Sequence, residues 1–333
     1  MPRAWFRVPS TRSSRRSRAL ARITAVTLRP LTSIVPLNER GVRLSRRIVA
    51  GALALVSPAL AGTDRRAVDG SAPAGVRVRG EWVRARRTCR DDAVILYVHG
   101  SGYAVCSART HRGVTSRLSM ATGLPVFACD YRLAPRHRFP AAAHDVRAAY
   151  DWLRAHGYSP DRIVLAGDSA GAHLAVDLVL ELNRVGQQVP STMVLFSPLV
   201  DPTLSLARER EKLRRDPMIT AARARRIVEL YTRDADPTDP RLTLRFTEGQ
   251  VLPSTLIQAG GAEMLADDAG SLARSIRSGG GTCELQVWPD QMHVFQAFAA
   301  VLPEGRRAMR GAAEFVRAEL GRAPQKRELT ESA

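Results

Sequence analysis

From residue 93 onward, short apolar runs alternate with longer stretches whose apolar residues recur at helical spacing. The short runs are residues 94–98, 125–129, 163–166, 193–196, 255–258 and 285–288. Runs of this length and kind are typical of strands buried on both faces of a parallel sheet. The stretches that favour helices are residues 141–155, 170–185, 266–277 and 306–320. The alternation predicts an α/β fold, with a mostly parallel central sheet and helices on both of its faces.

Residues 201–248 interrupt this alternation. They contain two charged stretches with helical spacing and a turn rich in Pro and Asp at residues 236–240. Segments inserted beyond the ends of strands often form the lids of binding sites. We therefore predict that this insertion is part of a helical cap.

The apolar run at residues 48–56 has the length and the small-residue end of a secretory signal peptide. The basic region in front of it is nearly 50 residues long, which is much longer than the basic region of an ordinary signal. The run is also shorter than the roughly 20 apolar residues that span a bilayer. We predict a cap helix that ends near Pro58, with an export signal as the alternative.

Positive charge is concentrated at the start of the chain. The formal net charge is +18, and the first 90 residues contribute +16 of it through 20 arginines and four acidic residues. Such a stretch suits nucleic acid or an anionic membrane, but an arginine bias also arises from coding-sequence composition. We expect no specific nucleic-acid partner and keep peripheral contact with anionic surfaces as an alternative.

These patterns predict the domain organisation. The expected parts are a basic, disordered extension (1–35), N-terminal cap helices (36–75), a catalytic domain (76–322) with a cap insertion (201–248), and a C-terminal tail (323–333). The chain has four cysteines, Cys89, Cys106, Cys129 and Cys283. Their spacing is neither metal-binding nor redox-active, so we expect free thiols in a reducing compartment. This favours a cytoplasmic location, with membrane or envelope association as the alternative.

Residues 167–171 read Gly-Asp-Ser-Ala-Gly and match the pattern G-x-S-x-G. A predicted strand precedes them and a predicted helix follows, which is the context of a nucleophile elbow. The two glycines permit a sharp turn, and the start of the helix brings backbone N–H groups beside the serine oxygen. The pattern predicts Ser169 as a nucleophile.

Residues 99–103, which read His-Gly-Ser-Gly-Tyr, follow the first apolar run. A loop at this position supplies backbone N–H groups that stabilise the negative charge developing on a carbonyl oxygen under attack. We predict an oxyanion hole formed by the N–H groups of Ser101, Gly102 and Ala170.

One histidine lies beyond residue 173, namely His293, directly after the last apolar run. In chains with this kind of elbow the nucleophile comes first, then the acid, then the base. We therefore predict His293 as the base. His173 lies four residues after Ser169 on the same predicted helix, and we expect it to pack or cap there.

Three carboxylates, Glu263, Asp267 and Asp268, follow the fifth apolar run. Either an Asp or a Glu can orient the base and stabilise its protonated form. Asp267 and Asp268 fall where a helix is predicted to begin, so they can cap its first turn. The loop position favours Glu263 as the acid, with Asp267 as the alternative.

Across roughly residues 75–320 the chain resembles the hormone-sensitive-lipase-like family of α/β-hydrolases, in its bacterial esterase branch. Beyond the elbow, the matching segments are His-Gly-Ser-Gly at 99–102, Tyr-Arg-Leu-Ala-Pro at 131–135, Phe-Pro-Ala-Ala-Ala at 139–143, Asp-Pro-Thr-Asp-Pro at 236–240 and His-Val-Phe at 293–295. The resemblance implies the α/β-hydrolase fold with a two-part cap. It also implies Glu263 as the acid, because the family commonly has its acid about 30 residues before the histidine.

Two segments depart from the family pattern. The family has glycine where this chain has Ser101, and residues 136–138 read Arg-His-Arg where the family usually has an acidic residue and Pro. An oxyanion donor is a backbone N–H, so Ser101 can serve, while its side chain can narrow the acyl pocket.

The predicted function is that of a carboxylesterase- or lipase-type serine hydrolase, which forms an acyl-enzyme on Ser169. The resemblance implies esters of short to medium acyl chains as substrates. The alternatives are a deacetylase or amidase of a small acylated metabolite, and a non-catalytic ligand-binding protein on the same fold. No metal or organic cofactor is expected, because no ligand cluster or phosphate-binding loop appears. The expected partner is a small-molecule ester, and the expected assembly is a monomer or homodimer.

Overall fold

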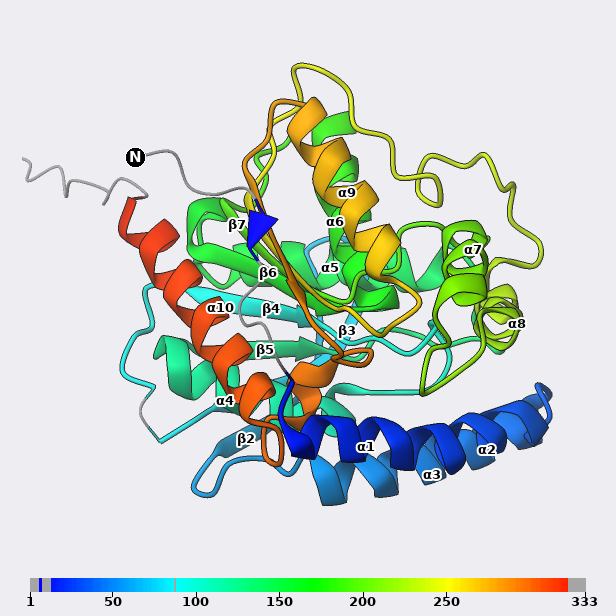
Figure 1. The fold of residues 1–333 in the computed structure, drawn as a ribbon. Helices are drawn as coiled ribbons and strands as arrows, with labels where there is room; N and C mark the ends of the chain where they lie inside the picture. Colours follow the sequence, from blue (N-terminus) through cyan, green and yellow to red (C-terminus); the bar gives the residue numbers. More distant parts are fainter. Residues whose placement is uncertain (1–5, 8–12, 87, 323–333) are drawn as a thin grey trace, which may run out of the picture.

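The computed structural model describes residues 6–7, 13–86 and 88–322, and the strands among them form one sheet in the order β1-β9-β8-β7-β6-β4-β5-β3-β2 (Figure 1). These strands are β1 (Phe6–Arg7), β2 (Asp64–Ser71), β3 (Arg77–Arg84), β4 (Val94–Val98), β5 (Val126–Cys129), β6 (Ile163–Asp168), β7 (Thr192–Phe196), β8 (Ser254–Gly260) and β9 (Cys283–Trp288). The ladders that join β4 to β9 are all parallel, whereas β2 and β3 pair antiparallel at one edge. The prediction of a mostly parallel sheet is confirmed.

The six apolar runs coincide with β4 to β9. Every residue of β4, β5, β6 and β7 is buried. Because helices cover both faces of these strands, side chains on both faces must be apolar, and the sequence shows no alternation of polar and apolar residues.

Two buried apolar clusters, one on each face of the sheet, join the helices to it. The helices on one face are α5 (Ala141–Ala155), α6 (Ala170–Arg184) and α9 (Ala266–Ser278), and those on the other are α4 (Arg112–Thr122) and α10 (Pro303–Arg322). Three short 3-10 helices connect these layers: η1 (Ala108–His111), η2 (Pro160–Arg162) and η3 (Phe295–Phe298). The predicted layered arrangement is therefore confirmed.

The remaining helices form the cap. They are α1 (Arg15–Val26), α2 (Leu28–Ile34), α3 (Glu39–Val56), α7 (Ser205–Leu213) and α8 (Ala221–Thr232). Figure 1 shows α1, α2 and α3 along one side of the body, with α7 and α8 nearer to α2 than to the start of α1. The cap thus has two parts, from the N-terminus and from the insertion, and α3 ends two residues before Pro58. No helix of the described residues is long and apolar enough to cross a bilayer.

The prediction that residues 1–35 are a disordered extension is wrong for residues 15–34, which form α1 and α2. Contacts with the body order them. The N–H and the hydroxyl of Ser14 donate to the two carboxylate oxygens of Glu304 at 2.6 and 3.1 Å, and the Ser17 hydroxyl donates to Gln291 at 3.0 Å. Composition indicated disorder because these tertiary partners lie more than 270 residues away in the sequence.

The prediction of cap helices throughout residues 36–75 is also wrong beyond α3, because residues 64–71 form β2. This strand lies at the edge of the sheet and is largely exposed, so its sequence is polar and lacks the apolar signal of a buried strand. It pairs along its whole length with β3, whose burial alternates. The predicted C-terminal tail, residues 323–333, lies outside the described residues.

Replacing Glu304 by Ala is expected to lower the free energy of unfolding by about 1–3 kcal/mol, because it leaves the start of α1 without its buried acceptors. Thermal or denaturant unfolding measures the change. Glu314→Ala on the same helix is the matched control: Glu314 is exposed, and its loss should change stability by less than about 0.5 kcal/mol. Equal effects of both variants would show that Glu304 does not anchor α1.

Candidate active site

Ser169 occupies the turn between β6 and α6 with φ 52° and ψ −122°, a left-handed conformation that a residue with a Cβ adopts only under constraint. Two backbone hydrogen bonds supply that constraint. The Ser169 N–H donates to the Phe196 carbonyl oxygen at 3.0 Å, and the Ser169 carbonyl oxygen accepts from Leu199 at 3.1 Å. The end of β7 therefore holds the predicted nucleophile in a strained turn at the carboxyl edge of the sheet.

The glycines on either side of Ser169 let the turn approach β4. A Cβ on Gly171 would lie 2.1 Å from the carbonyl oxygen of Val98 and 2.4 Å from that of His99. A Cβ on Gly167 would lie 2.9 Å from the Val98 oxygen. Side chains at these positions would push the turn away from the strand that carries the loop 99–103.

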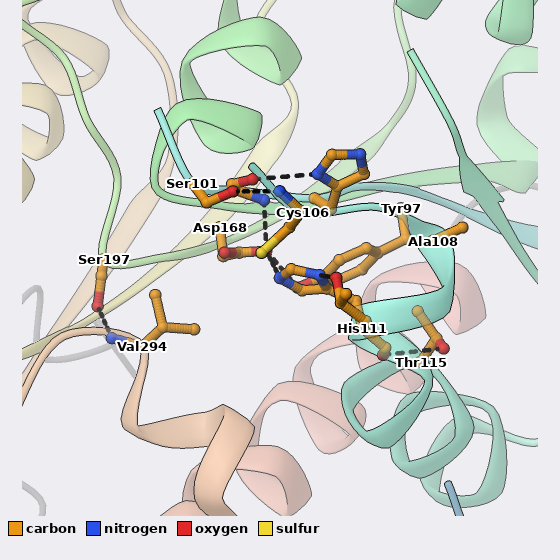
Figure 2. A network of polar contacts seen from close by, with 12 residues as sticks. Tyr97, Ser101, Cys106, Ala108, His111, Thr115, Asp168, Ser197 and Val294 are labelled. Atoms are coloured by element: carbon orange, nitrogen blue, oxygen red, sulfur yellow. Dashed lines mark hydrogen bonds and ion pairs between the residues drawn. The ribbon is translucent and has the colours of Figure 1, made fainter. Parts of the chain in front are cut away.

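His293 and Glu263 meet at the same edge of the sheet. Nδ1 of His293 lies 2.7 Å from Oε2 of Glu263, and Oε1 of this buried carboxylate accepts the N–H of Gly260 at 2.9 Å. An ionised carboxylate only accepts hydrogen bonds, so Nδ1 carries a hydrogen, and the neutral ring has its lone pair on Nε2. The Val294 N–H donates to the Ser197 hydroxyl at 3.0 Å and anchors the chain after the histidine (Figure 2).

The two other carboxylates of this region make different contacts. Asp267 is half-exposed and pairs with Arg210 of α7 at 2.8 Å. Asp268 is buried and accepts the N–H groups of Val200 and Asp201 at 3.2 Å each. Glu263 is thus the member of the predicted set that contacts His293.

The electrostatic surroundings of His293 favour its protonated form. Burial lowers the pKa of His293, but the hydrogen bond and charge of Glu263, followed by the charges of Asp216 and Asp168, outweigh it and raise the pKa above 6.5. Asp216 belongs to the cap insertion, is fully buried, and accepts the N–H of Met264 at 2.9 Å. The insertion therefore places a second carboxylate close to the histidine and beside the loop that carries Glu263.

The loop 99–103 bends through three consecutive left-handed residues, with φ 83° at Ser101, 61° at Gly102 and 59° at Tyr103. The Ser101 hydroxyl turns back on this loop and accepts the N–H of Cys106 at 2.8 Å. Across the described residues, no hydrogen bond engages the N–H groups of Ser101, Gly102 or Ala170. These three donors are free to bind an oxygen atom at the site.

A buried carboxylate, that of Asp168, connects the loop to the turn at Ser169. One of its oxygens, Oδ1, accepts the Tyr97 hydroxyl at 2.7 Å and the Gly100 N–H at 3.1 Å, and lies 3.3 Å from Nε2 of His111 (Figure 2). A Cβ on Gly100 would lie 2.2 Å from the other oxygen, Oδ2. The residue before the predicted nucleophile thus holds the loop that carries the predicted oxyanion donors.

The charge of Asp168 favours the protonated form of His111 in this network. Nε2 of His111 faces the carboxylate of Asp168, and its Nδ1 lies 3.3 Å from the carbonyl oxygen of Ser107. Nδ1 also lies 3.0 Å from the Thr110 hydroxyl, which can donate or accept a hydrogen bond. Burial lowers the pKa of His111, but the charge and hydrogen bond of Asp168 raise it more. A buried ion pair of this kind loses much stability when one partner is removed.

Tyr131, the first residue of the Tyr-Arg-Leu-Ala-Pro segment, supports the same loop. Its hydroxyl donates to the carbonyl oxygen of His99 at 2.7 Å, and its ring stacks on the His99 ring with centroids 4.3 Å apart. Burial lowers the pKa of His99 to about 3, so this imidazole is neutral. His173 lies apart from this network and, as expected, packs in the body, with Nε2 3.2 Å from the Leu242 carbonyl oxygen.

A cavity of about 570 Å³ joins these groups to the cap. Ser101, Gly102, Ser169 and His293 line its floor, and its walls are mostly apolar. The wall residues from α1, α2 and α3 include Leu20, Leu28, Leu31, Ile48, Val49 and Leu53, and those from α8 include Ile227 and Val228. The volume lies in the range of small-molecule sites.

Sequence patterns did not indicate roles near the site for His111, Asp168 and Asp216. His111 has no local pattern that distinguishes it from a surface histidine, and Asp216 lies in an insertion without a predicted contact. Asp168 stands inside the G-x-S-x-G pattern at a position that the pattern leaves open. One signal was available in the sequence for Asp168. A single charged residue that directly follows an apolar strand is expected to be buried, and a buried charge needs a partner.

A family model described as the alpha/beta hydrolase fold matches residues 95–297. An acetyl-hydrolase of Streptomyces hygroscopicus is 39% identical over 241 residues, which cover 72% of this chain and 80% of the relative. The esterase LipU of Mycobacterium tuberculosis is 36% identical, covering 68% and 78%. The crystal structure of an esterase from the bacterial hormone-sensitive lipase family has a TM-score of 0.82 and 34% identity, covering 93% of this chain and all of that one. The chain therefore belongs to the α/β-hydrolase fold, within the hormone-sensitive-lipase-like family of bacterial esterases.

Proposed function

We propose that Ser169, His293 and Glu263 form the catalytic triad of this carboxylester hydrolase. The contact of 2.7 Å between His293 and Glu263, on a cavity that Ser169 also lines, is the observation that supports this assignment. Asp267, the alternative acid, pairs with Arg210 instead. The triad would hydrolyse the ester in two steps through an acyl-enzyme.

In the first step the Ser169 hydroxyl attacks the ester carbonyl carbon, and Nε2 of His293 accepts the hydroxyl proton. Glu263 holds Nδ1, keeps the ring in the tautomer that leaves Nε2 free, and stabilises the imidazolium. The tetrahedral intermediate expels the alcohol, which takes the proton from Nε2, and leaves the acyl group on Ser169. Water then attacks the acyl carbon while Nε2 of His293 accepts its proton. Collapse of the second tetrahedral intermediate returns this proton to the Ser169 oxygen and releases the carboxylic acid.

The negative charge on the carbonyl oxygen would be bound by the N–H groups of Ser101, Gly102 and Ala170. Asp168 and Tyr131 hold the loop that carries the first two donors before substrate binds. Donors fixed in advance need no reorganisation during the reaction, and one such donor contributes about 3 kcal/mol to transition-state stabilisation.

The cavity supports esters with an apolar acyl group as substrates. Its walls are mostly aliphatic, and Ser169 and His293 are among the polar residues that line it, while the cap adds Thr24, Thr27, Thr32, Ser45 and Arg223. Similar proteins include one called an acetyl-hydrolase, which indicates short acyl groups, while a cavity of about 570 Å³ leaves room for medium ones. We propose short- to medium-chain acyl esters, in agreement with the family resemblance.

We also propose that the chain works in a reducing compartment such as the cytoplasm. Its four cysteines are free thiols, and three of them are buried. Burial raises the pKa of Cys106 to about 11 and that of Cys283 to about 12. These thiols are protonated at neutral pH and therefore unreactive.

Ser169→Ala is expected to abolish hydrolysis of short p-nitrophenyl esters, with kcat lower by a factor of about 10³–10⁶, because the nucleophile is lost. Glu263→Ala should lower kcat by roughly 10²–10⁴, since the ring of His293 loses its orienting partner. Asp267→Ala is the matched control in the same segment and should retain activity within about threefold. If Asp267→Ala loses more activity than Glu263→Ala, the assignment of the acid is wrong.

As the pH falls, kcat/KM should decrease with an apparent pKa above 6.5, because His293 acts only when neutral and its pKa is raised. Asp216→Asn removes a negative charge that favours the imidazolium, so this apparent pKa should move to lower pH. Asp267→Asn is the control and should leave the apparent pKa unchanged. An unchanged apparent pKa in Asp216→Asn would exclude an electrostatic effect of this residue on His293.

Ser101→Gly should keep kcat within about threefold of the wild type, because the proposed oxyanion donor is a backbone N–H. Glycine relieves the left-handed conformation but loses the hydrogen bond to Cys106, so the free energy of unfolding should change by less than about 1 kcal/mol. Kinetics with esters of two to twelve acyl carbons and thermal unfolding measure both effects. A loss above about a hundredfold would show that the Ser101 side chain takes part.

A further inference from the structure

We propose that the outer face of the cap hairpin, which consists of α1, α2 and α3 (residues 15–56), binds an anionic lipid surface, and that ester substrates enter the cavity from that surface. The inference rests on the proposed function, because it concerns the delivery of substrate to Ser169. It names esters held in anionic lipid assemblies as the substrate class.

The cap hairpin is strongly basic. Residues 15–56 contain nine arginines and one acidic residue, Glu39. The exposed arginines for which the described structure shows no ion pair are Arg15, Arg16, Arg18, Arg22, Arg40 and Arg47. Each arginine of this kind near an anionic membrane contributes to attraction over about one Debye length.

The hairpin also exposes apolar side chains. Of the large apolar residues that are exposed in the described chain, five lie on these three helices: Ile23, Val26, Ile34, Leu44 and Leu55. The exposed fraction is 74% for Val26, 75% for Ile34 and 83% for Leu55. Single exposed apolar residues are ordinary, but several on one short hairpin mark an interaction surface.

Basic and apolar residues share one stripe on α3 and one on α1. On α3 the exposed residues Arg40, Leu44, Arg47 and Leu55 are separated by three or four residues, or by multiples of a turn, so they face the same side. On α1, Arg15, Arg22 and Val26 have the same relation. A helix that lies in a membrane interface binds lipid headgroups through its basic residues and inserts its apolar side chains shallowly between the lipids.

The cavity extends between the helices of this hairpin. Ile23 and Ala52 both line the cavity and are exposed, and they come from α1 and α3 respectively. Leu28 and Leu31 of α2 and Val49 of α3 continue the lining inward. Figure 1 shows the hairpin along one side of the body, so its outer face is accessible to a flat surface. An acyl chain leaving a lipid surface there would meet an apolar path to Ser169.

The residue types favour lipid over nucleic acid. Residues 15–56 contain no Phe, Tyr or Trp, which are the side chains on which unpaired bases stack. A surface that binds duplex phosphates gains nothing from exposed Val26, Ile34 or Leu55. Both features suit a lipid interface, where aliphatic side chains leave water and arginines meet headgroup phosphates.

The test is vesicle cosedimentation of the full-length Ser169→Ala protein, so that lipid hydrolysis does not interfere. The vesicles contain either phosphatidylcholine alone or equal parts of phosphatidylcholine and phosphatidylglycerol. We expect binding to the mixed vesicles at least tenfold tighter than to phosphatidylcholine, and weaker at high salt. The combined variant Arg22→Glu, Arg40→Glu and Arg47→Glu should lose at least tenfold of this affinity.

The matched control replaces three exposed arginines of the body, Arg245, Arg274 and Arg310, by Glu, which changes the net charge equally. Its binding should stay within about threefold of the parent protein, and thermal unfolding checks that both variants are folded. The proposal is overturned if both variants lose affinity alike, if both vesicle types bind equally, or if duplex DNA displaces the protein from mixed vesicles at equal phosphate concentration. Binding is measured without turnover, so failure of the proposed triad would appear separately, in the hydrolysis assays.

Discussion

The left-handed turn at Ser169 is the constraint on which the site depends. A serine adopts it only because Phe196 at the end of β7 holds its N–H and Leu199, just beyond β7, holds its carbonyl oxygen. Gly167 and Gly171 also leave room for the backbone of β4. The close approach of these backbones brings the loop 99–103 beside the hydroxyl. Strain at one residue is therefore balanced by the pairing of a parallel sheet that is buried on both faces.

Buried charges then fix the groups around that turn. The carboxylate of Asp168 accepts from Gly100 and Tyr97 and faces the ring of His111, whose pKa it raises, so its charge is compensated inside the core. Glu263 is compensated in the same way by Gly260 and His293. Uncompensated carboxylates would be too costly at this depth. The arrangement thus orients the loop and the histidine before any substrate arrives.

The cap is joined to the site rather than merely placed over it. Asp216 of the insertion accepts the Met264 N–H next to Glu263, and Ser17 of α1 donates to Gln291 two residues before His293. Both parts of the cap therefore also touch the segments that carry the acid and the base. Because one contact comes from the N-terminal helices and the other from the insertion, movement of the cap would reach both segments.

The sequence by itself determined the six buried strands, the turn at Ser169 and the single late histidine, because burial on both faces and sharp turns demand particular residues. The two-part cap followed from the family resemblance. The sequence left open the choice between Glu263 and Asp267, because both have carboxylates in one short segment. Tertiary structure brought Glu263, and not Asp267, into contact with His293. It also decided that residues 15–34 form helices, that residues 64–71 form a strand and that His111 pairs with Asp168. Each of these depends on a partner far away in the sequence, and periodicity reports only what a residue's immediate neighbours require.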